Sequence, residues 1–330
     1  MNLKQLIFLF SFLFLIQTIQ VQAVYSAVKK VPDQYPTIQK AIDAASPGDR
    51  VLVAAGTYFE HINLKKGVTL QGGWQKNFSM QDVKKYETII DGAKEKGPVV
   101  IGADNAVIYG FTIIHGSLLV EGDSSLGSGI YCKNVSPKII NNIIRDNEPS
   151  GIYCSGSKAT IKANRIYNNA QAGVYVQKDS RVTVTGNVIY GNKYSGISTG
   201  KKPISFIEAI NNTIFKNERS GINLNDATGR IYNNIIYDNK NAGIRARHAP
   251  LVVANNTVTG NGQSGFTMEN PAAVAKVINN IFYMNQEAGI RTAGQGYSSN
   301  LLFANGGLGK CNPDFLWCVR FQFGGYEDET

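Results

Sequence analysis

The chain has 330 residues and a mass of 35.9 kDa, which is long enough for one large domain or two ordinary ones and excludes a mini-protein. Charged residues make up only 17% of the chain and hydrophobic residues 43%, which excludes a disordered chain and a charged coiled coil. Lysine and arginine together number 33 against 24 aspartate and glutamate, so the net charge is +9. This excess of positive charge favours anionic partners.

The first 23 residues have the three parts of a secretory signal peptide. Met1 to Lys4 form a short positive start, Leu6 to Ile16 form an apolar run, and Val21-Gln22-Ala23 form a small-residue cleavage site. The apolar run is too short for a stable membrane span. We therefore expect a secreted or periplasmic protein with no membrane span after signal cleavage.

A short amphipathic helix is predicted from Thr37 to Ala45. Ile38, Ala41, Ile42 and Ala45 have the i, i+3, i+4, i+7 spacing of one helix face, and Thr37 is a suitable N-cap. The following Pro-Gly pair ends the helix. Residues after it, as far as position 115, read as short, irregularly spaced strands.

A repeat of about 22 residues organises the rest of the chain. Gly followed by Ile, Val or Phe recurs at intervals of 22, 22, 23, 25, 22, 22 and 24 residues, at Gly129, Gly151, Gly173, Gly196, Gly221, Gly243, Gly265 and Gly289. The phrase Asn-x-(Ile/Val/Phe)-x-x-Asn keeps phase with it from Asn142 to Asn285. Each unit holds three stretches of alternating apolar and polar residues, which indicates three strands per coil. We expect apolar columns that begin at Ile130, Ile139 and Ile144 to fill the axis, and the Asn columns to hydrogen-bond along it.

The phrases NRIYNNAQAGVYV, NVIYGNKYSGIST and NNIIYDNKNAGIRA resemble the repeats of right-handed parallel β-helix proteins of the pectate-lyase-like superfamily. The resemblance covers Gln34 to about Gly307. It implies an all-β, right-handed, single-stranded parallel β-helix with a short N-terminal capping α-helix. Members of the superfamily include polysaccharide lyases, hydrolases, esterases and epimerases, so the resemblance specifies the fold more closely than the function.

Four segments are predicted on this basis. A signal peptide spans residues 1–23, and a cap helix with irregular entry coils spans residues 24–115. Regular coils of the same domain span residues 116–306, with an insertion from Gly116 to Ser128 before the first of them. Residues 307–330 form a C-terminal cap segment, because an open end would expose the core and unpaired strands.

The four cysteines fall into two pairs. Cys311 and Cys318 enclose six residues of the cap segment, and a disulfide between them would staple it. Cys132 and Cys154 share an inward column, where parallel side chains fit a disulfide dihedral poorly, so buried thiols and a bridge both stay open. No cysteine and histidine spacing indicates a metal site, and no cofactor is expected beyond a weak signal for Ca²⁺ from Asn225, Asp226 and Glu269.

The candidate site is the outward side of the first strand of each coil, where aromatic residues precede ionisable ones. Proposed substrate-binding residues are Tyr131, Tyr153, Tyr175, Asn223 and Arg291, and proposed catalytic residues are Asp226, Arg245, Arg247, His248 and Glu269. The arginines would pair with uronate carboxylates, the tyrosines would stack on sugar rings, and His248 is the preferred base for a lyase-like β-elimination. Asp226 and Glu269, two coils apart, leave an inverting hydrolase open. A solvated face of paired charges is the competing interpretation.

Two functions follow from these residues. The first is an exported protein that binds, and could cleave, an acidic polysaccharide. The second is a non-catalytic structural or adhesion module that contacts a cell-envelope component. Nucleic acid is an unfavoured partner because export outweighs the net charge, and a monomer is expected.

Overall fold

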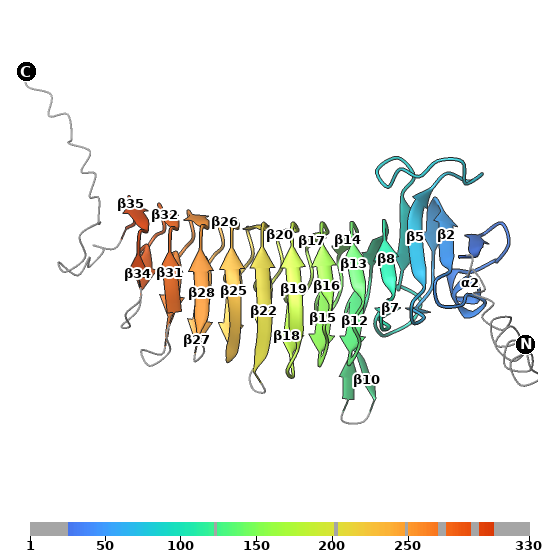
Figure 1. Cartoon of the computed structure of the whole chain (residues 1–330), viewed down its shortest axis with the longest axis horizontal. Helices are drawn as coiled ribbons and strands as arrows, with labels where there is room; N and C mark the ends of the chain where they lie inside the picture. The colour runs from blue at the N-terminus through green and yellow to red at the C-terminus, as the bar shows by residue number, and fades with distance from the viewer. Residues whose placement is uncertain are drawn as a thin grey trace, which may run out of the picture.

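The computed structural model describes residues 26–121, 124–200, 204–247, 250–269, 275–291 and 297–306. These residues wind into a rod along which three parallel sheets run, with one strand of each sheet in every regular coil (Figure 1). The predicted all-β parallel β-helix is therefore confirmed. The predicted signal peptide and the predicted C-terminal cap with Cys311 and Cys318 lie outside the described residues, as does His248.

The strands of each sheet follow one another along the rod, and every pair between neighbouring coils is parallel. Sheet A has 12 strands: β1 (Val28–Val31), β2 (Arg50–Ala54), β5 (Thr69–Trp74), β8 (Val107–Tyr109), β13 (Lys138–Ile140), β16 (Thr160–Lys162), β19 (Arg181–Thr185), β22 (Ser205–Ile210), β25 (Ala227–Tyr232), β28 (Leu251–Ala254), β31 (Ala275–Ile278) and β34 (Tyr297–Ser298). Sheet B has 11 strands: β3 (Gly56–Tyr58), β6 (Thr88–Asp91), β9 (Thr112–Ile114), β14 (Ile143–Arg145), β17 (Arg165–Tyr167), β20 (Val188–Tyr190), β23 (Thr213–Phe215), β26 (Ile235–Tyr237), β29 (Thr257–Thr259), β32 (Ile281–Tyr283) and β35 (Leu301–Phe303). Sheet C has 10 strands: β4 (Ile62–Asn63), β7 (Val100–Ile101), β12 (Ile130–Lys133), β15 (Ile152–Ser155), β18 (Val174–Gln177), β21 (Ile197–Thr199), β24 (Ile222–Asn225), β27 (Ile244–Arg247), β30 (Phe266–Met268) and β33 (Ile290–Arg291).

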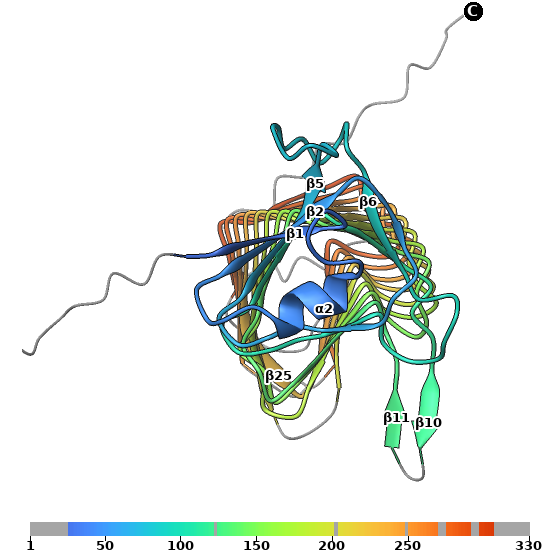
Figure 2. The same ribbon diagram turned by 90° about the vertical axis from the view of Figure 1, so that its right-hand side faces the viewer.

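The N-terminal coils belong to the same three sheets as the regular repeats. Strands β2, β5 and β8 pair in sequence with β13, and only β2 and β5 show a register shift, between Leu52 and Ala54. The insertion at residues 116–128 contains an antiparallel hairpin of β10 (Leu119–Glu121) and β11 (Ser124–Leu126), which projects from the rod (Figure 2).

The predicted apolar columns fill the axis of the rod. In the regular coils their members have no exposed surface, and the exception is Ile290, which is partly buried in the last described coil. Burial of this kind stabilises a fold by roughly 25 cal/mol per Å² of apolar surface. The repeated glycine has a packing reason as well, because a Cβ on Gly173 would lie 2.7 Å from the carbonyl oxygen of Gly196 in the next coil.

Two ladders of buried asparagines run beside the core, as predicted. In each ladder the side-chain Nδ2 of one asparagine donates to Oδ1 of the asparagine one coil further on, at 2.9–3.1 Å. Each Oδ1 also accepts from the backbone N–H of the preceding asparagine, as Asn187 does from Asn164 at 2.8 Å. The ladders therefore satisfy buried polar groups at two corners of every coil.

The residue before each ladder asparagine adopts the left-handed conformation that glycine, asparagine and aspartate tolerate best. In the second ladder these positions are Asp146, Asn168, Gly191, Lys216, Asp238, Gly260, Met284 and Ala304, with φ between 50° and 63°. Lys216, Met284 and Ala304 are not among these residue types, so the left-handed backbone conformation destabilises the fold at these three positions.

Lys216→Gly should raise the free energy of unfolding by about 0.5–1 kcal/mol, because the gain from removing a left-handed side chain exceeds the extra entropy of glycine in the unfolded chain. Urea denaturation measures the change. Lys193→Gly is the control, since Lys193 is exposed and is not among the residues with positive φ. A loss of stability in Lys216→Gly equal to that in the control would contradict the argument.

Helix α2 (Ile38–Asp43) begins where the sequence predicts and lies across the N-terminal end of the coils (Figure 2). Thr37 is its N-cap, and the Thr37 hydroxyl accepts from the backbone N–H of Lys40 at 3.2 Å. The carboxylate of Glu60 accepts from the backbone N–H groups of the first two helix residues, Ile38 and Gln39, at 2.9 and 3.0 Å. Ile38, Ala41 and Ile42 are buried against the core, so the helix covers the open end.

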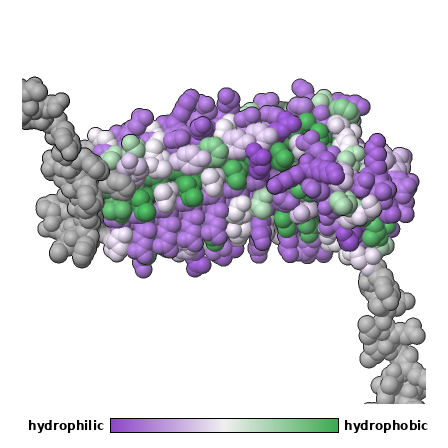
Figure 3. Space-filling model, turned by 90° about the horizontal axis from the view of Figure 1, so that it is seen from above, coloured by the Kyte–Doolittle hydropathy of each residue, from purple (hydrophilic) through white to green (hydrophobic). Residues whose placement is uncertain are grey.

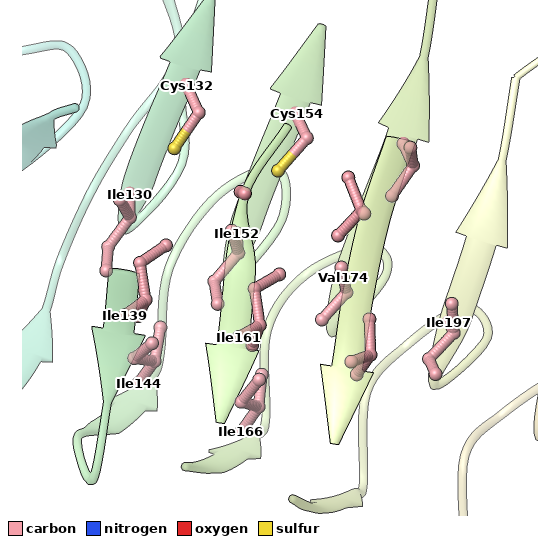
Figure 4. Close-up of a cluster of buried hydrophobic side chains, with 14 of the residues drawn as sticks. Ile130, Cys132, Ile139, Ile144, Ile152, Cys154, Ile161, Ile166, Val174 and Ile197 are labelled. Atoms are coloured by element: carbon pink, nitrogen blue, oxygen red, sulfur yellow. The ribbon is translucent and has the colours of Figure 1, made fainter. Parts of the chain in front are cut away.

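Cys132 and Cys154 are buried free thiols, the first of the two alternatives. They are in register on β12 and β15, and both sulfur atoms point into the apolar core (Figure 4). Hydrogen bonding with Cys154 and then burial raise the pKa of the Cys132 thiol well above its usual range. A protonated thiol is a poor nucleophile, so Cys132 is unreactive.

The outer surface of sheet B carries aromatic and apolar side chains. Four rings, those of Tyr167, Tyr190, Phe215 and Tyr237, stack with centroids 4.7–4.9 Å apart and nearly parallel planes. Ile235 on the same sheet is 50% exposed. Figure 3 shows one side of the rod, on which hydrophobic patches follow one another along the axis between polar surfaces.

Candidate functional site

The outer face of sheet C meets a column of turn residues along one edge. The turn column consists of the residues two positions before the last five repeated glycines: Tyr194, Arg219, Asn241, Gln263 and Glu287. Each of the last four donates its backbone N–H to the carbonyl of the turn residue one coil earlier, at 2.9–3.3 Å. The backbone thus stacks these side chains beside the outward residues of sheet C.

A pocket of about 740 Å³ lies between the turn column and the C-terminal strands of sheet C. Its walls include three arginines, Arg219, Arg245 and Arg291, from successive parts of the rod. Glu269 and Glu287 also line it, together with the amides of Asn241 and Gln263. The pocket therefore combines positive charge with neutral hydrogen-bonding groups, on the face that the sequence singled out.

Arg245 and Arg247 both bind Glu269. Arg245 Nε donates to Glu269 Oε1 at 2.5 Å, Arg247 Nε donates to Oε2 at 2.6 Å, and the Nη2 group of each arginine contacts the same oxygen as its Nε. Both arginines project from β27, and Glu269 follows β30 in the next coil. The three side chains, hereafter the arginine-glutamate triad, are each about one third exposed, at 32%, 33% and 31%.

The triad keeps Glu269 ionised. Burial raises the pKa of this carboxyl, but hydrogen bonds and charge from Arg245 and Arg247 outweigh burial, so its pKa lies below the ordinary glutamate value. A lowered folded-state pKa means that the triad's contribution to stability is present above the unfolded-state pKa and is lost as the pH falls through the folded-state pKa. A carboxylate with a lowered pKa is also a weak general base.

Arg219 is arranged differently from the other two pocket arginines. Its guanidinium lies over the ring of Tyr194, 4.3 Å from the ring centroid, and the side chain is exposed. Among the described residues no carboxylate forms an ion pair with it, whereas Arg291 pairs with Glu287 at 3.3 Å. Stacking holds the planar group in place and leaves its edge available for a ligand.

The other predicted site residues are placed as follows. Asn223 lies on the outer face of sheet C beside Arg245, but it is only 3% exposed and its Oδ1 has no partner. Asp226 follows β24 with φ 46°, and its backbone N–H donates to the carbonyl of Arg247 at 3.2 Å. Asp226 and Glu269 are thus two coils apart, as expected, with Arg247 in the coil between them. Because both oxygens of Glu269 bind arginines, it is a poor general acid for a hydrolase.

The three tyrosines that were proposed to stack on sugar rings lie in register on neighbouring strands of sheet C. The rings of Tyr131, Tyr153 and Tyr175 stack with centroids 5.2 and 5.4 Å apart, and burial raises the pKa of all three, that of Tyr153 to about 12. The Tyr153 hydroxyl accepts from Gln177. Because the rings stack on one another, their inner faces are not available to a sugar.

The turn column was not predicted from the sequence. Arg219, Asn241 and Gln263 recur at a fixed offset before the repeated glycine, whereas the proposed site residues all follow it. Reading the same offset in every coil would have found them.

The fold is that of a parallel β-helix protein with a polar pocket on one sheet. A family model described as "Periplasmic copper-binding protein (NosD)" matches residues 104–301. Since this match covers more than half of the chain, the protein belongs to the NosD family. The periplasmic location given in that description agrees with the predicted export, and no helix in the described part of the chain is long and apolar enough to cross a bilayer.

Solved structures with the same architecture share little sequence with the chain. The A-module of the mannuronan C-5 epimerase AlgE4 from Azotobacter vinelandii is 18% identical with a TM-score of 0.51, over 79% of this chain and 94% of the epimerase module. Pectate lyase Pel9A is 15% identical with a TM-score of 0.50, over 78% and 77%. The Dettilon tailspike protein is 16% identical with a TM-score of 0.59, over 83% and 66%. No curated protein matches the sequence significantly. These likenesses show the fold alone.

The described residues do not fit a copper or calcium site. No group of three or more His, Cys, Asp or Glu side chains in this part of the chain could hold a metal ion. Copper(I) prefers thiolates, but the Cys132 and Cys154 thiols are sealed in the apolar core, and the pKa of Cys132 is raised. Two arginines occupy the oxygens of Glu269, which opposes its use as the predicted Ca²⁺ ligand.

Proposed function

We propose that the protein binds an acidic polysaccharide in the pocket beside sheet C. The observation that carries the proposal is Arg219, a guanidinium held flat by Tyr194 at the pocket wall, with no carboxylate paired to it among the described residues. The edge of a guanidinium can donate two parallel hydrogen bonds to a carboxylate. The net charge of +9 adds long-range attraction for a polyanion.

Two further observations support a carbohydrate partner. The pocket offers amide groups of Asn241 and Gln263 that can hydrogen-bond sugar hydroxyls. Proteins of the same fold include a mannuronan C-5 epimerase and a pectate lyase, both named for acidic polysaccharides. We infer a secreted or periplasmic location from the signal sequence and from the family description.

The proposal concerns binding and does not include cleavage. β-Elimination needs a base near the sugar. The arginine-glutamate triad makes Glu269 a weak base, and His248, the predicted base, lies outside the described residues. The absorbance of unsaturated uronate in a mixture of protein and polyuronate would reveal a lyase directly. The alternative is a structural or adhesion module, and a protein without affinity for any polyuronate would favour it. The expected monomeric state stays a prediction.

Arg219→Gln should weaken the binding of trigalacturonate by about 10- to 100-fold, the loss expected when a charge-assisted pair is removed. Calorimetric titration at two salt concentrations measures both the affinity and its salt dependence, which should also become flatter. Arg230→Gln on sheet A removes the same charge from a different face and is the matched control. Equal effects in the two variants would mean that only net charge matters and would refute the assignment of the pocket.

A further inference from the structure

The arginine-glutamate triad has the geometry of a carboxylate-binding subsite that is already filled. Two guanidiniums converge on one carboxylate, and each donates through Nε and Nη2 to one of its oxygens. We propose that Glu269 is an internal stand-in for a ligand carboxylate, and that a uronate group of the ligand binds between Arg245 and Arg247 once Glu269 is removed or displaced. This inference deepens the proposed function and rests on it for the identity of the natural ligand.

The fold does not need the triad for its stability. Coils of the rod are joined by backbone ladders and by buried asparagine ladders that pass through the same coils. Ion pairs as exposed as those of the triad contribute little to stability. A convergence of four N–H donors on one carboxylate is therefore better explained by recognition than by support of the sheet.

The donor arrangement selects a carboxylate. Each guanidinium directs two N–H groups at one oxygen, so together the two arginines match an anion with two charged oxygens. A hydroxyl group has a single, uncharged oxygen and cannot accept hydrogen bonds from both arginines in this way. A neutral sugar would therefore bind there only weakly. The subsite is thus specific for the charged group of a sugar acid.

The position of the triad suggests a ligand with more than one carboxylate. Arg245 and Glu269 line the pocket that also contains Arg219. Arg219 precedes β24 and Arg245 lies on β27, so the two arginines belong to neighbouring coils, which are about 4.8 Å apart. A polyuronate with a carboxylate on successive units could pair with Arg219 and, in place of Glu269, with Arg245 and Arg247.

Glu269 then acts as a competitor for the ligand. While it is in place, the two arginines are already paired, and of the described arginines that line the pocket only Arg219 has no carboxylate partner among the described residues. Removing its charge should strengthen binding, which is the opposite of what is expected for a residue that contacts the ligand favourably or holds the pocket in shape.

The test compares Glu269→Gln with Glu218→Gln. Glu218 pairs with Lys240 outside the residues that line the pocket, so this control makes the same change in net charge. We expect Glu269→Gln to bind trigalacturonate about tenfold more tightly than the wild type, and Glu218→Gln to bind it with nearly unchanged affinity. Glu269→Ala is a second variant that should show the same gain, and thermal unfolding establishes that each variant is folded.

A second readout separates this inference from the proposed function. Acetate is titrated into the wild type and into Glu269→Gln while the Nε–H resonances of the arginines are followed by NMR. Saturable shifts of the Arg245 and Arg247 resonances in the variant, absent in the wild type, would support the subsite. This holds even if trigalacturonate binds neither protein, because a failure of trigalacturonate to bind would defeat only the proposed function. Unchanged or weaker trigalacturonate binding together with no response to acetate would overturn the inference. An equal response to sulfate would overturn the selectivity for carboxylates.

Discussion

Asn187→Asp is expected to lower the free energy of unfolding by about 4 kcal/mol at pH 7, since it places a carboxylate inside an asparagine ladder. The native Nδ2 donates to the carbonyl of Ile161 at 2.9 Å and to Oδ1 of Asn212 at 3.0 Å. It also donates to the carbonyl of Thr185 at 3.1 Å, so the substitution replaces that donor with an oxygen that faces three other oxygens. Urea denaturation followed by circular dichroism measures the loss.

Asn211→Asp is the matched control for this change. Asn211 is exposed and has φ 56°, a conformation that aspartate tolerates. The free energy of unfolding of the Asn211→Asp variant should therefore change by no more than about 0.5 kcal/mol. Burial should also raise the pKa of the new carboxyl in Asn187→Asp above its unfolded value. The cost is then largest above that raised pKa and becomes smaller as the pH falls through it. A cost that is equal in the two variants, or that does not depend on pH, would contradict the ladder's role.

Ile189→Asp should cost about 5 kcal/mol or more, because it removes a completely buried side chain from the axis of the rod and leaves a charge without a partner there. We expect the variant to melt far below the wild type or to fail to fold. Lys178→Asp is the comparison, since Lys178 is exposed at φ 54° and aspartate suits that conformation. Similar melting temperatures for the two variants would show that the inward column has been misassigned.

The repeating part of the fold could be predicted closely from the sequence, because the same packing requirements recur in every coil. The spacing of Gly173 and Gly196 reflects a close approach between neighbouring coils, and the apolar columns reflect one continuous core. Thr37 was recognisable as an N-cap because helix ends have local signals. The pairing of Glu60 with the helix N-terminus was not recognisable, since it depends on where a later coil brings that side chain.

The candidate site was predicted less completely. Arg245, Arg247 and Glu269 were correctly grouped, because residues at one offset in neighbouring coils must be close in space. That Glu269 binds both arginines depends on side-chain directions that periodicity does not determine. The predicted exposure of Asn223 failed for a similar reason: an outward direction does not ensure access when neighbouring side chains cover the residue.

Each coil of the rod contacts only the coil before it and the coil after it, so the effects of a change remain local. The pocket lining comes from the coils of β24, β27, β30 and β33, and Tyr194, from the turn before β21, stacks on Arg219. A whole extra coil inserted before that turn would leave the pocket walls and this stacking intact and move them about 4.8 Å further from helix α2. The distance between the pocket and the N-terminal end can therefore vary in evolution in fixed steps, independently of what the pocket binds.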